Sequence, residues 1–152
     1  MRPVADAVGE AATMTFEQLG FILTLGRIDA IPEDAGEKHA MKVAFRGHID
    51  GVLEVRLFGS SLDALSSNIL ASEDGAGAGA KTEVLAEFTN IVCGNMLPMI
   101  AGPEAVFDVG APVPLDPASS SPVDEGPETV VVRMELEEGY AEFRVRTWAP
   151  RD

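Results

Sequence analysis

The chain has 152 residues, a formal net charge of -14 at pH 7 and a hydrophobic fraction of 46%. That length suits one compact domain and is too short for two ordinary ones. The charge argues against nucleic acids and anionic membranes as partners, because both attract cationic proteins, and no apolar run approaches the ~20 residues that cross a bilayer. We therefore expect one soluble domain over residues 1–152. Its acidic surface favours a protein partner with Lys or Arg, although the same charge also fits a surface that only maintains solubility.

The cellular compartment is indicated by the start of the chain and by its cysteine content. The stretch MRPVADAVGE has one Arg, followed by acid and glycine where a signal peptide carries its apolar stretch. Cys93 is the single cysteine, so no internal disulfide can form, which fits a reducing environment. We predict a cytoplasmic protein.

The first half of the chain predicts a helix, a hairpin and a second helix. Apolar residues recur at helical spacing over residues 4–25, and apolar and polar residues alternate over residues 41–49 as in a half-buried strand. Asp50-Gly51 separates this strand from the apolar run 52–58, which predicts a β-hairpin that turns at these two residues. Helical spacing returns over residues 61–72, after serines that can cap a helix.

The middle of the chain predicts a long helix between two irregular segments. Residues 73–80 are a glycine-rich loop, and a helix is expected over residues 81–97 with Thr82 as its N-cap. A short strand over residues 105–109 precedes a proline-rich surface loop over residues 112–127.

The C-terminal part predicts a second hairpin. Residues 129–137 alternate, turn at Glu138-Gly139 and return over residues 141–147. The order helix, hairpin, helix, helix, strand, hairpin suits an α+β fold. In such a fold a mainly antiparallel sheet carries about three helices packed on one face.

Three features that resemble chemical motifs are better explained by structure. The stretch GAGAGAKT, residues 75–82, is similar to a phosphate-binding loop, but Ala80 interrupts the motif and no buried strand precedes it, so we expect a linker. His39 and His48 do not lie with Cys or carboxylates at metal-ligand spacing. Cys93 is explained by helix packing, because a nucleophilic thiol needs a base and a thiolate-stabilising environment.

The helix over residues 81–97 has an unusual polar face. With about 100° per residue, Glu87, Asn90 and Gly94 lie within about 40° of Glu83, opposite the apolar face. Asn and Gly together cost roughly 1.5 kcal/mol of helix propensity relative to Ala, so helix stability does not explain them. Asn95 instead points into the apolar face, where we expect it to be buried and to hold the fold together through a hydrogen bond.

This polar face has a chemical interpretation. Glu87 and Asn90, three residues apart, bring a carboxylate and an amide to one point. Gly94 removes side-chain bulk, so another protein's backbone can approach, and Glu83 belongs to the same partner-facing surface. An amide cannot act as a general base, but it can orient a water for in-line attack on a phosphoryl group. A solvated helix face with a chance E-x-x-N spacing gives the same pattern, so the residues alone leave both interpretations open.

The stretch EFTNIVCGNMLP, which begins at Glu87, resembles the E-x-x-N helix of the CheC/CheX/FliY chemotaxis phosphatases. Glu87 and Asn90 match the signature Glu and Asn, and Gly94-Asn95 match the G-N pair that follows. The order of elements also resembles CheX over most of the chain. Outside this helix the similarity is one of pattern rather than identity.

The resemblance implies hydrolysis of the aspartyl phosphate on a CheY-like response-regulator receiver domain. By that resemblance, Asn90 enters the partner's active site and aligns the attacking water, and Glu87 pairs with the partner's lysine. The receiver domain would hold the Mg2+, so this chain needs no cofactor or metal ligand of its own.

The sequence also departs from the family pattern. CheC-type members carry a second E-x-x-N copy on the first helix, where this chain has Glu10 with Thr13 and Glu17 with Gly20, without an amide. One site per chain is therefore predicted, as in CheX, and the resemblance to CheX implies a homodimer. Glu83 stands where CheC-type motifs usually have Asp or Ser. These departures keep an alternative open, namely a non-catalytic receiver-binding adaptor or a flagellar-switch-like interaction module on the same fold.

Overall fold

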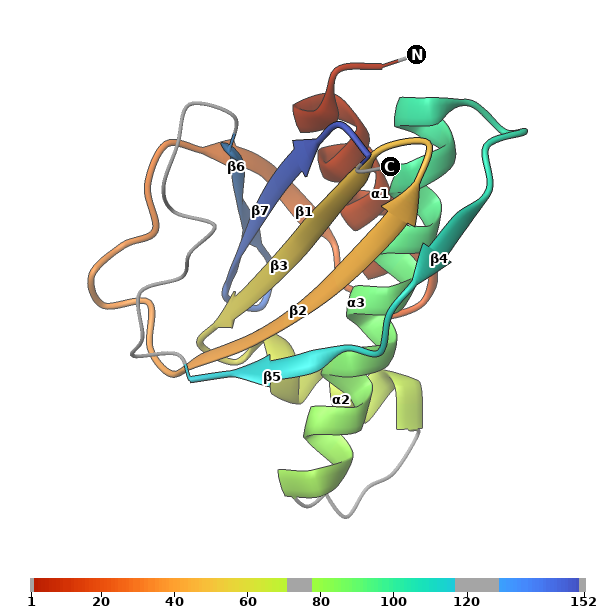
Figure 1. Ribbon diagram of the computed structural model, residues 1–152. Helices are drawn as coiled ribbons and strands as arrows, with labels where there is room; N and C mark the ends of the chain where they lie inside the picture. The colour runs from red at the N-terminus through yellow and green to blue at the C-terminus, as the bar shows by residue number, and fades with distance from the viewer. Residues whose placement is uncertain (1, 71–77, 117–128, 151–152) are drawn as a thin grey trace.

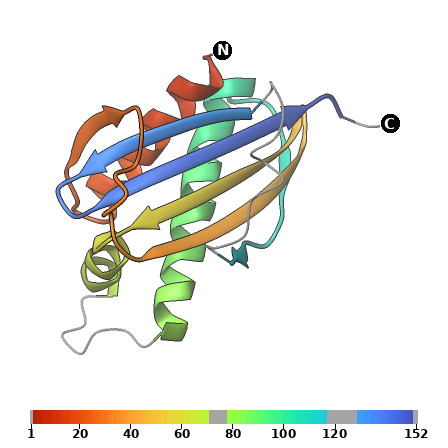
Figure 2. The ribbon, with the colours of Figure 1, turned by 90° about the vertical axis from the view of Figure 1, so that its left-hand side faces the viewer.

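The computed structural model describes residues 2–70, 78–116 and 129–150. In these ranges, three helices and seven strands form two layers, with the helices on one face of the sheet (Figures 1 and 2). The elements follow the chain as α1 (Val4–Gln18), β1 (Thr24–Ile28), β2 (Lys38–Gly47), β3 (Asp50–Phe58), α2 (Ser61–Leu70), α3 (Ala78–Ala101), β4 (Phe107–Val109), β5 (Val113–Leu115), β6 (Thr129–Leu136) and β7 (Tyr140–Trp148). The strand order is β1-β6-β7-β3-β2-β4, with β5 also paired to β2, and every pairing is antiparallel. The predicted α+β class, with helices on one face of an antiparallel sheet, is confirmed.

The core lies between the helical layer and the sheet. Phe16 of α1 and Phe88 of α3 have ring centroids 4.6 Å apart, and Phe143 of β7 lies 6.3 Å from Phe16. All three rings are fully buried, and each removes a large apolar area from water. This packing fixes α3 against α1 and the sheet, and therefore fixes which side of α3 remains outside.

The helix α3 is the central helix of the layer (Figure 1). Its span Ala80–Ala101 has 22 residues and a mean hydropathy of 1.4, so length and composition alone would let it cross a membrane. That differs from our expectation that no apolar stretch reaches such a length. Half of the apolar window is buried inside the protein, as in the core helix of a soluble domain.

The first helix is shorter than predicted, and an unpredicted strand follows it. Helix α1 ends at Gln18, and Thr24–Ile28 form the edge strand β1 instead of continuing the helix to Leu25. At Gly20 a Cβ atom would lie 2.5 Å from Leu65 Cδ1, so the chain turns closely over α2 at this residue. The apolar spacing continues into β1, which is why the sequence pattern did not mark the end of the helix.

The first hairpin is confirmed, but its turn is displaced. The chain reverses at His48-Ile49, and Asp50-Gly51 already belong to β3, with Gly51 opposite Phe45. A Cβ atom at Gly51 would lie 2.4 Å from Phe45 Cζ. It would also lie 2.6 Å from the Arg146 carbonyl oxygen of β7, so the two neighbouring strands and not the turn require glycine here.

Helix α3 extends beyond both predicted ends. Residues 78–80 are helical, so Thr82 lies inside the helix rather than at its N-cap, and the helix continues through Pro98 to Ala101. A proline inside a helix removes one backbone hydrogen bond, and the buried residues Leu97 and Ile100 on either side hold this last turn against the core.

The remaining strands agree with the prediction in part. The strand expected over residues 105–109 is shortened to β4, and the proline-rich segment contributes β5, which pairs with β2. Most of that segment, residues 117–128, lies outside the described residues. The C-terminal hairpin of β6 and β7 is confirmed, with Gly139 in the turn at φ +87°.

Candidate functional site

The polar face of α3 lies outside the core. Glu83, Glu87 and Gly94 are exposed and Asn90 is half-buried, whereas Phe88 is completely buried. One helix therefore separates a packed face from a face that is open to a partner. The structure brings the four predicted residues together on one stretch of surface.

The two carboxylates on this face are one helical turn apart. Neither Glu83 nor Glu87 forms a hydrogen bond or ion pair with any other described residue. Like charges at this spacing destabilise a helix by about 0.2–0.5 kcal/mol. A cation near the pair would relieve this repulsion.

The side chain of Asn90 has an unused acceptor. Its Oδ1 atom is buried and has no hydrogen-bond partner among the described residues. An unsatisfied buried polar atom costs about 1–3 kcal/mol. Because this oxygen is shielded from solvent, a water or a partner group can donate to it only after the Asn90 side chain rotates.

Gly94 opens the surface one turn after Asn90. A Cβ atom built at Gly94 meets no atom within 4 Å, and its φ is not positive. Neither packing nor backbone conformation therefore requires glycine at this position. What the glycine provides is clearance above the helix.

Asn95 lies on the other side of α3. It is half-buried rather than fully buried, and its Nδ2 atom donates to Thr15 Oγ1 of α1 at 3.5 Å. Thr15 Oγ1 in turn donates to the Ala11 carbonyl at 2.7 Å. The amide therefore faces the junction of α1 and α3, which fits the structural role that we predict for it.

The two glutamates of α1 at the positions of a second motif, Glu10 and Glu17, form contacts within the chain. Glu10 pairs with Arg2, and Glu17 accepts hydrogen bonds from the backbone N–H and the hydroxyl of Thr24 at 3.4 and 3.1 Å. Both carboxylates therefore hold the N-terminal segment and β1 in place. Within the described part of the chain, only α3 presents the E-x-x-N pattern to the surface.

Neither a metal site nor a cysteine nucleophile accompanies this surface. No group of three or more His, Cys, Asp or Glu side chains that could hold a metal occurs among the described residues. Cys93 is fully buried, and burial raises the pKa of its thiol to about 12. A thiol with this pKa stays protonated and cannot act as a nucleophile near neutral pH.

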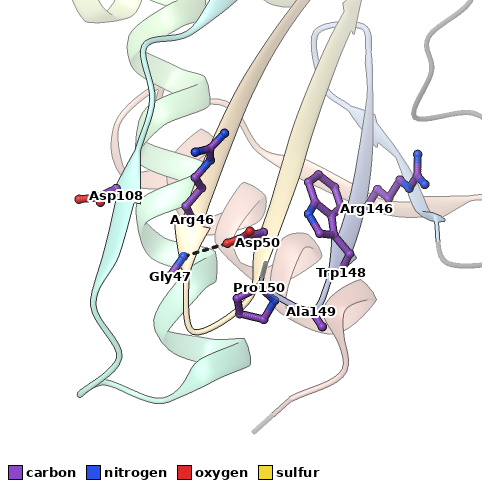
Figure 3. Close-up of a pocket in the computed structure, with 8 residues that line it drawn as sticks. All are labelled: Arg46, Gly47, Asp50, Asp108, Arg146, Trp148, Ala149 and Pro150. Atoms are coloured by element: carbon purple, nitrogen blue, oxygen red, sulfur yellow. Dashed lines mark hydrogen bonds between the residues drawn. The ribbon is translucent and has the colours of Figure 1, made fainter. Parts of the chain in front are cut away.

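A separate hollow of about 910 Å³ lies at one end of the sheet (Figure 3). It is lined by strand and C-terminal residues, namely Arg46, Gly47, Asp50, Asp108, Arg146, Trp148, Ala149 and Pro150. Two arginines and two aspartates line it, so its formal net charge is zero. The Asp50 carboxylate accepts a hydrogen bond from the Gly47 N–H at 3.2 Å. None of these residues belongs to α3, so the hollow is not part of the E-x-x-N surface.

Solved structures share this architecture over nearly the whole chain. The chemotaxis protein CheX from Vibrio vulnificus is 13% identical, with a TM-score of 0.76 and 97% of each chain covered. A chain of the CheX-CheY-BeF3-Mg2+ complex from Borrelia burgdorferi is 15% identical, with a TM-score of 0.71, covering 95% of this chain and 97% of that chain. The chain has the CheX-like fold. The resemblance predicted from the α3 sequence is thus confirmed at the level of the fold.

A further solved structure shares the fold at a lower TM-score. FliY from Thermotoga maritima is 16% identical, with a TM-score of 0.57, covering 98% of this chain and 91% of that chain. No family model matches the sequence, and no curated protein is significantly similar to it. The similarity to known proteins is therefore one of structure, and it concerns the fold rather than the individual residues of the site.

Proposed function

We propose that this protein removes the phosphoryl group from the aspartyl phosphate of a CheY-like receiver domain. The observation that carries the proposal is the exposed face of α3, where Glu87, the unsatisfied Asn90 amide and the open Gly94 lie together on a CheX-like fold. The Borrelia burgdorferi relative has been crystallised with CheY, BeF3 and Mg2+, which supports a receiver domain as the partner.

In this proposal the residues of α3 position groups rather than react themselves. The Asn90 side chain rotates so that its Oδ1 atom, which is buried in the free chain, accepts a hydrogen bond from the attacking water and holds it in line with the phosphorus. Glu87 pairs with a lysine of the receiver, and Glu83 adds negative charge beside it. Gly94 lets the receiver backbone approach. Holding reacting groups in line supplies much of the acceleration in phosphoryl transfer.

The proposal places the Mg2+ ion on the receiver domain, where it neutralises charge on the phosphoryl oxygens. It also places the reaction in the cytoplasm, where receiver domains are phosphorylated. This chain would then contribute a side-chain amide and a carboxylate, but no metal ligand.

A dephosphorylation assay tests the proposal. Receivers from the same genome are phosphorylated with a small phosphodonor, and loss of the phosphoryl group is followed with the wild type and with Asn90→Ala. We expect Asn90→Ala to slow the accelerated reaction by a factor on the order of 10² or more, because the water loses its orienting group. Equal inactivity of both proteins against every receiver would contradict the catalytic role.

A second candidate is a receiver-binding adaptor or a flagellar-switch-like module on the same fold. It is favoured by the shielding of Asn90 Oδ1, which is buried in the free chain, and by the absence of an amide in the comparable places on α1. Stable binding to a phosphorylated receiver with an unchanged phosphate lifetime would support the adaptor and exclude the phosphatase.

A further inference from the structure

The hollow at the end of the sheet (Figure 3) gathers polar side chains from three adjacent strands. The hydrophobic-core residues of β2, β3 and β7 are all odd-numbered, and side chains alternate between the two faces of a strand. The even-numbered residues therefore point to the face opposite the three helices, among them Arg46, Asp50, Arg146 and Trp148, which line the hollow. Asp50 lies directly opposite Trp148. The strand register thus places these four side chains on one surface.

The two arginines bring guanidinium groups that the fold does not use for ion pairs. Arg46 and Arg146 are both exposed, and neither guanidinium forms a hydrogen bond or ion pair with another residue that the structure describes. The Arg146 guanidinium lies 5.8 Å from the centre of the Trp148 ring, as in a cation–π contact. Guanidinium groups bind phosphate through two parallel hydrogen bonds. The hollow therefore offers two unused sites for an anionic group beside an aromatic ring.

The two carboxylates of the hollow differ in their orientation. In Figure 3, Asp108 points away from the other labelled side chains, whereas Asp50 lies between Arg46 and Trp148. Asp50 Oδ1 accepts the Gly47 N–H at 3.2 Å. A carboxylate has about four acceptor positions, so most of those of Asp50 remain for a ligand. A ligand that suits this hollow therefore combines an anionic group with N–H donors.

The same face of the sheet concentrates the cations of an acidic chain. By the strand register it carries, besides Arg46 and Arg146, five further cations, which makes seven of the eleven Lys and Arg residues: Lys38, Lys42, Arg56, Arg133 and Arg144. It carries five of the 25 Asp and Glu residues, namely Asp50, Glu54, Asp108, Glu135 and Glu142. This face therefore accepts a small anion that the net charge of -14 would otherwise repel.

We propose that this hollow binds a guanine nucleotide. The phosphates pair with Arg46 and Arg146, and the base stacks on Trp148. The adjacent N1–H and N2–H donors of guanine bind the Asp50 carboxylate. Adenine has an acceptor in place of N1–H, which the carboxylate repels. The volume of about 910 Å³ is within the range of small-ligand sites, about 300–1,000 Å³. The hollow lies outside α3, so this inference does not depend on the proposed phosphatase activity.

The test uses the fluorescence of Trp148, which is the single tryptophan of the chain and therefore reports binding at this place. The wild type is titrated with GDP, ADP and inorganic pyrophosphate, and the affinities are measured in parallel by isothermal titration calorimetry. We expect GDP to quench Trp148 and to bind at least about tenfold more tightly than ADP, because guanine pairs with Asp50 through two donors. Pyrophosphate has no base, so it should bind more weakly than GDP and leave the fluorescence unchanged.

Three single variants separate the contributions. Arg46→Met and Arg146→Met should each weaken GDP binding about tenfold or more, because each removes a charge-assisted contact to phosphate. Asp50→Asn keeps an acceptor for the Gly47 N–H but removes the carboxylate. It should weaken GDP binding and abolish the preference for GDP over ADP. Unspecific attraction of anions predicts the opposite for Asp50→Asn, namely tighter binding of all three compounds, because a negative charge is lost.

Lys38→Met is the matched control, because Lys38 lies on the same face and strand as Arg46 but at the other end of β2. At about 3.4 Å per residue the two lie roughly 27 Å apart, well beyond the screening length of about 8 Å at physiological salt. GDP binding should be unchanged, and thermal melts by circular dichroism verify that each variant is folded. Three results would overturn the proposal: no quenching of Trp148 by GDP, equal affinities for GDP and ADP, or losses of equal size in Lys38→Met and Arg46→Met.

Discussion

At the scale of single residues, substitution of Gly94 should have opposite effects on stability and on the proposed activity. Glycine in a helix interior costs up to about 1 kcal/mol relative to alanine, and nothing within 4 Å would obstruct a methyl group here. We expect Gly94→Ala to raise the free energy of unfolding by about 0.5–1 kcal/mol in urea denaturation. If the glycine provides clearance for a receiver, the same variant should slow receiver dephosphorylation severalfold. A more stable variant with an unchanged rate would remove Gly94 from the proposed site.

The buried thiol of Cys93 predicts a pH dependence of stability. Its pKa is about 12 in the folded protein and about 8.5 in an unfolded chain. Above pH 8.5 the unfolded state releases this proton while the folded state retains it. Stability is therefore lost as the pH rises from about 8.5 to about 12, by roughly 2 kcal/mol between pH 8 and pH 10.

The thiol contribution is isolated by comparing urea denaturation of the wild type and Cys93→Ala at both pH values. Cys93→Ala should lack this portion of the loss, because alanine does not titrate. Identical pH profiles for the two proteins would contradict a raised thiol pKa.

The site residues could be predicted because helical spacing alone determines which side chains share a face. Glu83, Glu87 and Gly94 are exposed as the spacing implies, and Phe88 is buried. The partial shielding of Asn90 could not be predicted, since it depends on how closely neighbouring elements pack around α3. The strand β1 could not be predicted either, because Leu23 and Leu25 fit helical spacing as well as they fit a strand.

At the scale of elements, β3 and β7 are joined by buried charges. Glu54 and Arg56 alternate with core residues of β3 and form an ion pair, although their side chains are 0% and 7% exposed. Arg56 Nη1 also lies 3.6 Å from Glu142 Oε1 of β7, and Glu142 accepts a hydrogen bond from Arg133 Nε at 2.7 Å. Buried ion pairs add little net stability but become costly when one partner is removed.

This network predicts that Arg56→Met strongly lowers stability, because the buried carboxylates of Glu54 and Glu142 would lose a positive partner. We expect the free energy of unfolding to fall by about 3–5 kcal/mol, measured by urea denaturation. Arg46→Met is the matched control, because Arg46 is exposed on the neighbouring strand β2 and should cost less than about 0.5 kcal/mol. An equal change in the free energy of unfolding for both variants would contradict a special cost of breaking the buried ion pairs.

The elements that the sequence did predict are those whose signals are local. Alternation identified β2, β6 and β7, the apolar run after Asp50-Gly51 identified β3, and helical spacing identified α2 and α3. The strand β5 depends on a non-local partner, since Pro114 lies opposite Met41, and its prolines are typical of a loop. The turn of the first hairpin was misplaced because Gly51 is required by Phe45 and the Arg146 carbonyl on the neighbouring strands, contacts that local turn statistics do not contain.

At the scale of the whole molecule, the CheX-like fold and the charge of -14 predict how self-association depends on salt. The resemblance to CheX leads us to propose a homodimer, whose mass in sedimentation equilibrium would be about twice 16.0 kDa. Two acidic copies repel each other, so dimerisation should strengthen when NaCl is raised from about 0.05 to 0.5 M. A mass of one chain at all salt concentrations would contradict the dimer.

The fold class followed from the order of elements, because helices and antiparallel hairpins in this order leave few arrangements that bury one common core. The order of elements did not predict the edge strand β1. Because β1 was not predicted, the exposure of Phe21 next to this edge could not be predicted either.

The proline inside α3 affects the E-x-x-N face of this helix. Pro98 lies four residues after Gly94, so its nitrogen is the atom that would donate to the Gly94 carbonyl in a regular helix. A proline nitrogen carries no hydrogen, and that helical bond cannot form. The Gly94 carbonyl oxygen thus lacks the donor that a regular helix would supply, beside a position without a side chain. Under the proposed function, we expect this backbone oxygen to serve the receiver as an acceptor next to the Glu87 carboxylate and the Asn90 amide. Recognition through this oxygen would survive every side-chain substitution on the face.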